Sequence, residues 1–167
     1  MMVGNVRTLI QSLFRSMSVA EPASRLDGLH VLYADDSPIL RKMVKRRLVD
    51  AGAIVYDYED GEQAVRAFDE LAHVFDIVLL DLDMPKLDGL GAASAIRQRH
   101  PTVPIIAVSG ENILLVQGAV VQAGMNAFVS KRPECISQLV SVIINLTCRS
   151  LWKPESSWQD KQPIIVA

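Results

Sequence analysis

The chain is poor in cysteine, and its two cysteines lack the spacing of a metal site. Cys135 and Cys148 are the only ones among 167 residues. Structural zinc sites need closely spaced Cys or His ligands, and a disulfide framework needs several bridges. We therefore expect neither, and we expect both cysteines to be ordinary helix residues of a protein kept in a reducing, cytoplasmic compartment.

Long apolar runs and a surplus of basic charge are also missing. No run approaches the roughly 18 apolar residues that a membrane-spanning helix needs. Lys and Arg number 17 against 19 Asp and Glu, so the net charge is −2, and no basic patch for nucleic acid is evident. Half of the residues are hydrophobic, which is typical of a globular chain. We expect about one folded domain, no membrane span and no nucleic-acid partner.

Residues 1–27 differ from the remainder in pattern and charge. Apolar residues recur there at intervals of three and four, as in an amphipathic helix. The segment carries Arg7 and Arg15 but no acidic residue before Glu21, a composition that also fits a mitochondrial transit peptide. We favour an N-terminal amphipathic helical extension or linker, and the transit peptide stays open. The apolar stripe consists of Val6, Leu9, Ile10, Leu13, Phe14 and Met17.

Between residues 28 and 149, short apolar runs alternate with amphipathic segments. Ser37 and Pro38 begin the first helix, because Ser caps helices and Pro suits the first turn. The last helix is expected from about Glu134 to Cys148. Five strand–helix units predict a doubly wound α/β fold with a five-stranded parallel sheet and helices on both faces. The strands are expected at residues 30–34, 54–58, 76–81, 104–108 and 126–130.

The last residues, 150–167, contain Pro and Ser and follow the final predicted helix. Chain ends of this kind are often poorly ordered unless a segment docks on the domain. We predict a flexible C-terminal tail with a short docked segment at Pro163–Val166.

Polar residues stand at the ends of four predicted strands. Asp35 and Asp36 end the first, Asp81 the third, Ser109 the fourth and Lys131 the fifth. In parallel α/β sheets the functional site lies beyond these carboxyl ends, so the five side chains should converge. Two carboxylates about 4 Å apart repel by about 4 kcal/mol at an effective dielectric of 20. A hard cation with oxygen ligands, such as Mg²⁺, would offset that repulsion.

This set of residues suits phosphoryl transfer to a carboxylate. Asp81 can attack as an anion and form an acyl phosphate without a separate base. A metal ion and Lys131 would offset the charge on the phosphoryl oxygens, and the Ser109 hydroxyl can donate to one of them. Each residue alone has an ordinary explanation, such as the acidic pair at a helix N-terminus. Their joint placement at different strand ends favours the site.

At this point the sequence resembles the receiver domains of two-component response regulators. The resemblance covers about residues 28–148, and the string Asp-x-x-Met-Pro-x-x-Asp-Gly at 81–89 is its most specific part. It implies a five-stranded, flavodoxin-like (βα)5 receiver domain at 28–149. The other matching strings lie at 31–37, 104–110 and 127–131.

The resemblance also implies roles for the acidic residues. Asp81 would be the phosphoacceptor. Mg²⁺ would be bound by Asp36 and Asp81, by Asp35 mostly through water, and by the backbone of Asp83.

It further implies that Ser109 and Lys131 contact the phosphoryl group. On phosphorylation Ser109 would move and Phe128 would change rotamer, which would switch partner binding. The donor would be a histidine kinase or a histidine phosphotransfer protein. The chain would be no enzyme beyond self-phosphorylation and autodephosphorylation.

One departure from the family pattern follows the lysine. The family usually has a proline there, preceded by a cis bond, whereas here Arg132 intervenes and the proline is Pro133. Either this loop is one residue longer or the cis bond is displaced to Arg132–Pro133.

Two other functions compete with the receiver. Asp81-x-Asp83 after an apolar strand also resembles phosphatases of the haloacid dehalogenase type, but these need acidic metal ligands after their lysine. Only Glu134, Glu155 and Asp160 follow Lys131 here. A degenerate receiver used as a scaffold is the second rival. Within the receiver family, a stand-alone regulator, a phosphorelay intermediate and a hybrid-kinase receiver stay open.

The predicted fourth helix, residues 112–123, is apolar on all sides. No charged residue lies between Glu111 and Lys131. A helix of this kind is normally buried, and an exposed apolar patch marks an interaction site. We expect a partner to bind here, either a second copy of the chain, a kinase or an effector; covering by residues 3–17 and no role at all are the alternatives. The predicted inward stripe is Val116, Ala119, Val120 and Ala123, which leaves Leu114 and Val121 outside.

Overall fold

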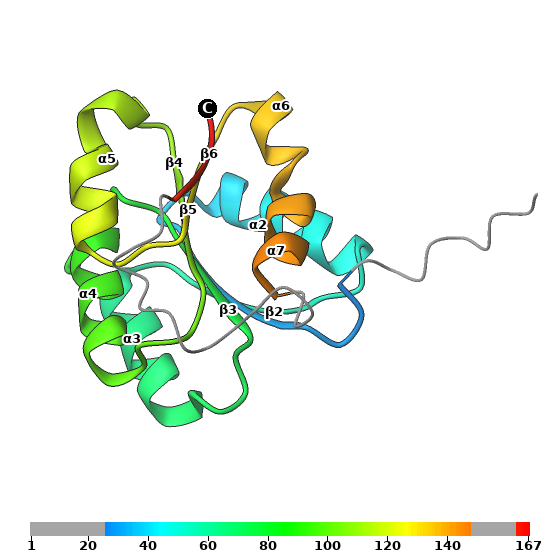
Figure 1. Cartoon of the computed structure of the whole chain (residues 1–167). Coiled ribbons are helices and arrows are strands. Elements are labelled where there is room, and N and C mark those ends of the chain that lie inside the picture. Colours follow the sequence, from blue (N-terminus) through cyan, green and yellow to red (C-terminus); the bar gives the residue numbers. More distant parts are fainter. Residues whose placement is uncertain (1–25, 148–162) are drawn as a thin grey trace, which may run out of the picture.

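The computed structural model describes residues 26–147 and 163–167. They form a parallel sheet of six strands in the order β2-β1-β3-β4-β5-β6 (Figure 1). Most of the predicted N-terminal extension and most of the predicted tail lie outside the described residues. The strands are β1 His30–Ala34, β2 Ile54–Tyr58, β3 Ile77–Leu80, β4 Ile105–Ser109, β5 Ala127–Ser130 and β6 Ile164–Val166.

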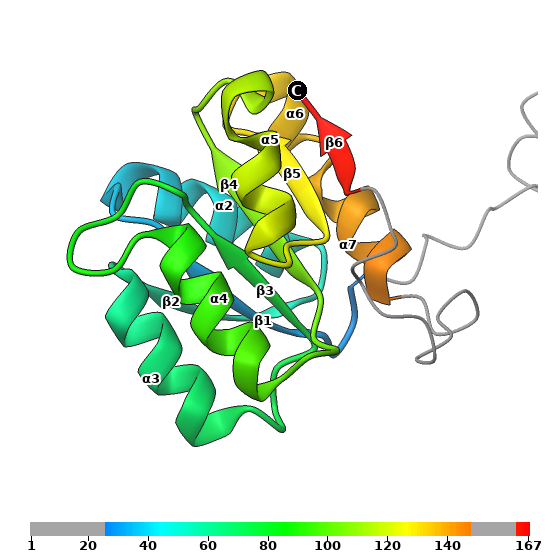
Figure 2. The same cartoon turned by 60° about the vertical axis from the view of Figure 1, so that its left-hand side comes forward.

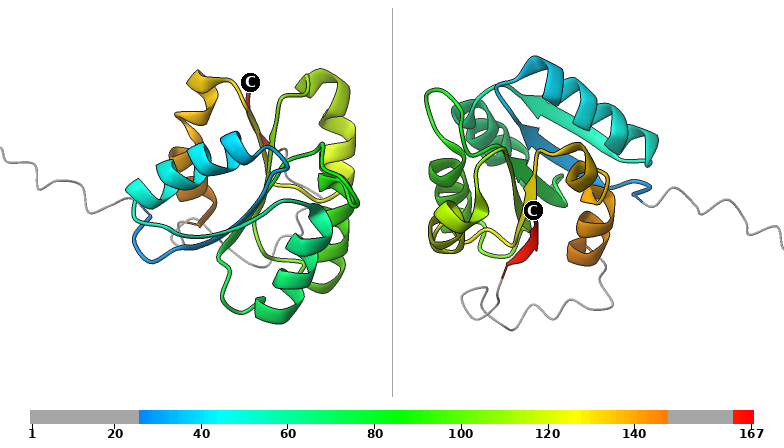
Figure 3. Two further views of the ribbon diagram at one scale, coloured as in Figure 1. Left: turned by 180° about the vertical axis from the view of Figure 1, so that it is seen from behind. Right: turned by 90° about the horizontal axis from the view of Figure 1, so that it is seen from above.

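Helices cover both faces of this sheet, as Figure 3 shows from behind and from above. Helices α3, α4 and α5 pack on one face, and α2, α6 and α7 on the other. Among the described residues, no helix is long and apolar enough to cross a membrane. The helices are α2 Pro38–Asp50, α3 Gly61–Leu71, α4 Gly89–Arg99, α5 Ile113–Gln122, α6 Pro133–Ile136 and α7 Leu139–Thr147.

Side-chain caps explain where four helices begin. The side chains of Ser37, Asp60, Asp88 and Asn112 each accept a backbone N–H of the helix that they precede. Such caps satisfy donors that have no partner within the helix. Helices α2, α3 and α5 begin three or four residues after the preceding strand, whereas α4 begins after a longer loop. The caps fix where each of these strand-end loops stops.

The sheet has a separate core on each face. Leu32, Val78 and Leu80 point to the α3–α4–α5 side, whereas Val31 and Leu79 point to the opposite side. All four residues of β3 are buried, which confirms the continuous apolar run as a central strand. Asp81 therefore follows a strand that is buried along its whole length.

The five-stranded sheet was wrong by one strand. The predicted docked segment near the C-terminus is β6, which pairs in parallel with the edge of β5 (Figure 2). Ile165 lies opposite Phe128, and the Ile164 N–H donates to the Asn126 carbonyl oxygen at 3.0 Å. An edge strand presents unpaired backbone groups, and a short apolar segment can pair with them.

The prediction of a single last helix was also wrong, because this segment is divided into α6 and α7. In a continuous helix, the Ser137 carbonyl oxygen would accept the backbone N–H four residues later. Instead, the Arg47 guanidinium of α2 donates to that carbonyl oxygen at 2.8 Å. The Ser137 hydroxyl also donates back to the Glu134 carbonyl, a local bond that competes with helix continuation.

Gly89 begins α4 at a point where no side chain fits. A Cβ atom there would overlap the backbone carbonyl of Asp81. By contrast, a Cβ atom at Gly118 in the middle of α5 would meet nothing within 4 Å. Gly89 is therefore what lets α4 approach the strand end that carries Asp81.

We predict that Gly89→Ala lowers the free energy of unfolding by about 1–3 kcal/mol, because the backbone must shift to admit the methyl group. Gly118→Ala is the matched control and should raise stability by up to about 1 kcal/mol, since Ala is the better helix former. Urea denaturation of both variants measures the difference. Equal stability of the Gly89 variant and the wild type would contradict this close approach.

Candidate functional site

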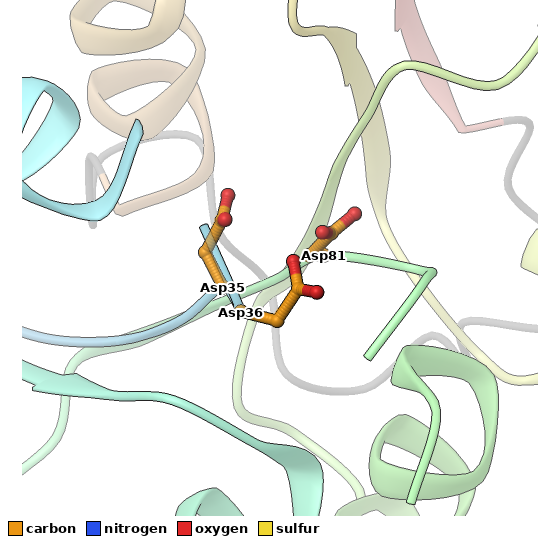
Figure 4. A group of neighbouring side chains, drawn as sticks. All are labelled: Asp35, Asp36 and Asp81. Carbon is orange, nitrogen blue, oxygen red and sulfur yellow. The ribbon is translucent and has the colours of Figure 1, made fainter. Parts of the chain in front are cut away.

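Three carboxylates meet at the carboxyl ends of β1 and β3. The parallel register places Ala34 beside Leu80, so Asp35 and Asp81 leave adjacent strands at the same level. Ligand oxygens of Asp35, Asp36 and Asp81 all lie within 4.8 Å of one another. Figure 4 shows the three side chains together at this edge. The predicted convergence of these residues is present.

Lys131 reaches the carboxylates from the end of β5. Its Nζ lies 2.5 Å from Asp81 Oδ2 and 2.9 Å from Asp35 Oδ2. The Lys131 N–H also donates to the Ser109 carbonyl oxygen at 2.9 Å, which ties this loop to the end of β4. One ammonium group therefore bridges the two buried carboxylates.

Burial and the lysine oppose each other at Asp81. The side chain is almost fully buried, and this burial raises the pKa of Asp81 despite the neighbouring Lys131. For Lys131, burial alone would lower the pKa, but the hydrogen bonds to Asp81 and Asp35 outweigh it and the pKa is raised. The lysine therefore stays charged over a wide pH range, whereas burial disfavours the ionised form of the aspartate.

Ser109 ends β4, between the strands that carry Asp81 and Lys131. It is buried, and its Oγ accepts the Glu111 N–H at 3.2 Å. A hydroxyl has one proton and two lone pairs, so this bond leaves its proton for another acceptor. Ser109 thus offers a donor at the same strand edge as the carboxylates.

Phe128 lies one strand further along, on β5, and is fully buried. It pairs with Ala107 of β4 and packs in the core beneath α5. Ser109 pairs with Ser130 in the same ladder, so the two predicted switch residues lie on adjacent strands.

Asp83 is exposed, and its carboxylate is not part of the acidic group. Its N–H donates to Asp81 Oδ1 at 3.3 Å, so the residue helps to hold Asp81. The contribution that the resemblance implies is the backbone oxygen of Asp83, and that stays a prediction.

The displaced cis bond at Arg132–Pro133 was wrong, because no cis peptide bond occurs in the described residues. Pro133 instead stands in the first turn of α6, and the Arg132 N–H donates to Ser130 Oγ at 3.4 Å. The inserted arginine leaves Lys131 aimed at Asp81 and Asp35.

Two residues that contact Asp35 were missed. The Tyr33 hydroxyl donates to Asp35 Oδ2 at 2.6 Å, and Arg41 Nη1 donates to the Asp35 carbonyl oxygen at 2.5 Å. A signal for the first was available, because residues two apart in a strand point to the same side. No local pattern marks Arg41, which reaches the site from α2.

A sequence profile of the response regulator receiver domain matches residues 31–143. The chain belongs to this family. It is 33% identical over 136 residues to the sensor protein GacS of Pseudomonas syringae, covering 78% of this chain but only 15% of that protein. It is 36% identical over 105 residues to a two-component response regulator of Oryza sativa subsp. japonica, covering 62% of this chain and 83% of that one.

Solved receiver domains share this fold. One from Clostridium thermocellum superposes with a TM-score of 0.67 at 24% identity and covers 73% of this chain and 96% of that one. The receiver of a Pseudomonas aeruginosa PAO1 sensor histidine kinase gives 0.66 at 29% identity, covering 72% and 98%. That structure has a magnesium ion coordinated in its active-site cleft.

The acidic group of this receiver fits such an ion. Mg²⁺ favours carboxylate oxygens and water, and it is usually held by one or two carboxylates. Asp36 is exposed, whereas Asp35 and Asp81 are buried, so the group is open to solvent on the Asp36 side. The donor set thus combines fixed ligands with room for water.

We predict that Asp81→Asn stabilises the Mg²⁺-free receiver at neutral pH. A raised pKa means that the folded state binds this proton more tightly than the unfolded chain does. The ionised carboxylate therefore lowers stability above its folded pKa, and this loss disappears as the pH falls through that pKa. Urea denaturation should show the gain at neutral pH and a smaller gain in acid.

The matched control is Asp69→Asn, an exposed carboxylate paired with Arg99 on the surface. It should change stability by less than about 1 kcal/mol at either pH. A less stable Asp81→Asn variant at neutral pH would contradict the prediction.

Proposed function

We propose that Asp81 is the phosphoacceptor of this receiver and that Asp35, Asp36 and the backbone of Asp83 complete a Mg²⁺ site beside it. The bridge from Lys131 Nζ to Asp81 and Asp35 is the observation that carries the proposal. The Lys131 ammonium is close enough to Asp81 to contact the oxygens of a phosphoryl group that becomes attached there, and so to offset their negative charge.

The transfer forms one bond and breaks one. A carboxylate oxygen of Asp81 attacks phosphorus, and the bond from phosphorus to the donor atom breaks with its electron pair leaving on the donor. Lys131 then follows the negative charge onto a phosphoryl oxygen, and the Ser109 hydroxyl donates to another. When bound, Mg²⁺ supplies charge neutralisation for the phosphoryl oxygens.

The donor that we propose is a histidine kinase or a histidine phosphotransfer protein. Support comes from relatives that are a sensor protein and a two-component regulator. The matched region spans 15% of the first and 83% of the second, so a stand-alone regulator and a hybrid-kinase receiver both stay open. Beyond self-phosphorylation and autodephosphorylation we propose no enzymatic activity, and the cytoplasmic location stays a prediction.

The haloacid dehalogenase type of phosphatase receives no support from the site. In the described part of the chain, Glu134 is the one acidic residue after Lys131, and it lies exposed on α6. It is not part of the acidic group.

We propose that phosphorylation is read out through Ser109 and Phe128. Phe128 packs in the same core as Ile113 and Val120 of α5. Movement of its ring therefore requires adjustment of that helix, which begins four residues after Ser109. A differential contact of a few kcal/mol is enough to shift such an equilibrium.

The outer face of α5 is the surface that we propose for a homodimer, with an effector as the alternative. Leu114 and Leu115 are each 80% exposed, and Val121 is 44% exposed. The inward stripe was right for Val120 and Ala123, but Ile113 is also buried and Leu115, which was not placed, points outward. Prediction from spacing failed at Leu115 because a uniformly apolar helix has no polar side to orient it.

We predict that Asp81 takes up phosphate from acetyl phosphate in the presence of Mg²⁺. Asp81→Asn should abolish the mass increase in intact-protein mass spectrometry, whereas the exposed control Asp69→Asn should keep it. Lys131→Met should reduce the rate by at least about tenfold, because a phosphoryl-transfer site loses its fixed cation. Normal uptake by the Asp81 variant would overturn the assignment.

We also predict that the activated receiver self-associates through α5. Beryllofluoride, a mimic of the phosphoryl group, should raise the molecular mass of the wild type from monomer to dimer in analytical ultracentrifugation. Leu114→Glu combined with Leu115→Lys should leave phosphorylation intact but abolish this increase. Val49→Glu, an exposed apolar position on α2, is the control and should behave as the wild type. A monomeric activated wild type would exclude the homodimer, and an unaffected double variant would exclude this face.

A further inference from the structure

A tyrosine stands directly beneath the acidic group. Tyr33 lies on β1 and its side chain is fully buried. Its hydroxyl donates to Asp35 Oδ2 at 2.6 Å, whereas the rest of the ring packs in the core on the α2–α7 side of the sheet. A buried phenol needs a hydrogen-bond partner, and here the partner is a carboxylate of the site itself.

The Asp35 carboxylate is held by three donors. Ser37 N–H donates to Oδ1 at 2.9 Å, while the Tyr33 hydroxyl and Lys131 Nζ both contact Oδ2. Asp35 has no exposed surface, so solvent cannot replace any of these donors. The orientation of this carboxylate is thus fixed by the protein alone.

Only one of the three donors has a second task. Lys131 Nζ lies closer to Asp81 than to Asp35, at 2.5 Å against 2.9 Å, so the same ammonium contacts both carboxylates. When that ammonium follows charge onto a phosphoryl oxygen, its contact with Asp35 weakens. A buried carboxylate that loses a donor is strongly destabilised unless other donors remain.

We propose that Tyr33 is a positioning residue that keeps the Asp35 carboxylate oriented toward the metal site and satisfied when Lys131 turns to the phosphoryl group. Together with Ser37 N–H, it leaves Asp35 with one donor on each oxygen. Lys131 can therefore give up its contact with Asp35 and turn to a phosphoryl oxygen without leaving that carboxylate unpaired. The inference rests on the proposed role of Asp81 and deepens it, because it concerns the same site.

Neighbours that orient a metal-binding side chain have measurable effects on the metal. Their loss typically weakens metal affinity or activity by about 10–100-fold. Tyr33→Phe removes the hydroxyl and leaves the ring in the core. We expect it to weaken Mg²⁺ binding by about tenfold, as followed by NMR titration or calorimetry. At saturating Mg²⁺ we expect slower phosphorylation by acetyl phosphate.

Tyr56→Phe is the matched control. Its hydroxyl lies 3.2 Å from His30 Nδ1, at the opposite end of β1 from Asp35. The variant Tyr56→Phe therefore removes a partly buried phenol hydroxyl from the same sheet without touching the acidic group. The Mg²⁺ affinity and the phosphorylation rate of this variant should equal those of the wild type. An equal loss in both variants would show a general structural effect and overturn the proposal.

A second comparison tests whether Tyr33 acts through Asp35. In an Asp35→Asn background, Tyr33→Phe should cause no further loss of Mg²⁺ affinity, because the group that it positions is no longer a carboxylate. Equal losses in both backgrounds, or unchanged affinity of the single Tyr33→Phe variant, would overturn the inference. Failure of the wild type to bind Mg²⁺ or to be phosphorylated at Asp81 would instead overturn the proposed function.

Discussion

The ammonium bridge from Lys131 to Asp81 and Asp35 is the interaction on which the remaining site geometry depends. Two buried carboxylates at one sheet edge repel strongly, and the Lys131 ammonium contacts both of them. The bridge is attainable only because the sheet is parallel. The strands bearing the two carboxylates end at the same level, and the loop after β5 is tied to the end of β4. Fold and charge distribution therefore constrain each other.

The packing around this bridge leaves little freedom for the backbone. The Asp81 N–H donates to the Ala34 carbonyl oxygen at 2.9 Å, and α4 starts against the Asp81 carbonyl through a glycine. The loop between them contains Lys86, which adopts a positive φ of 65° and pairs at 2.5 Å with the buried cap Asp60. A non-glycine residue in this region is uncommon. Asp81 thus follows a closely packed stretch of backbone and lies beside the exposed Asp36.

The sequence predicts much of this arrangement, because strand ends in a parallel sheet follow a general rule. Asp35, Asp36, Asp81 and Lys131 could be grouped without any structure. What failed depended on distant parts of the chain. The break between α6 and α7 involves Arg47, 90 residues from Ser137 in sequence. The sixth strand is too short for periodicity to identify, and its pairing depends on an edge that only the folded sheet presents. The contact between Tyr33 and Asp35 could have been inferred from their spacing of two residues along β1, whereas no local pattern marks Arg41, which reaches Asp35 from α2.

The sixth strand changes the surroundings of β5. In a five-stranded sheet, β5 would be the outermost strand, with one row of its amide and carbonyl groups open to water or to another chain. Here that row is occupied by β6, so the backbone around Phe128 is hydrogen-bonded on both sides. On this side of the sheet the edge strand is then the three-residue β6, whereas the opposite edge is β2. A shorter form of the protein that ends with α7 would uncover this row of backbone groups, so its tendency to aggregate would differ although every residue of the proposed phosphorylation site is retained.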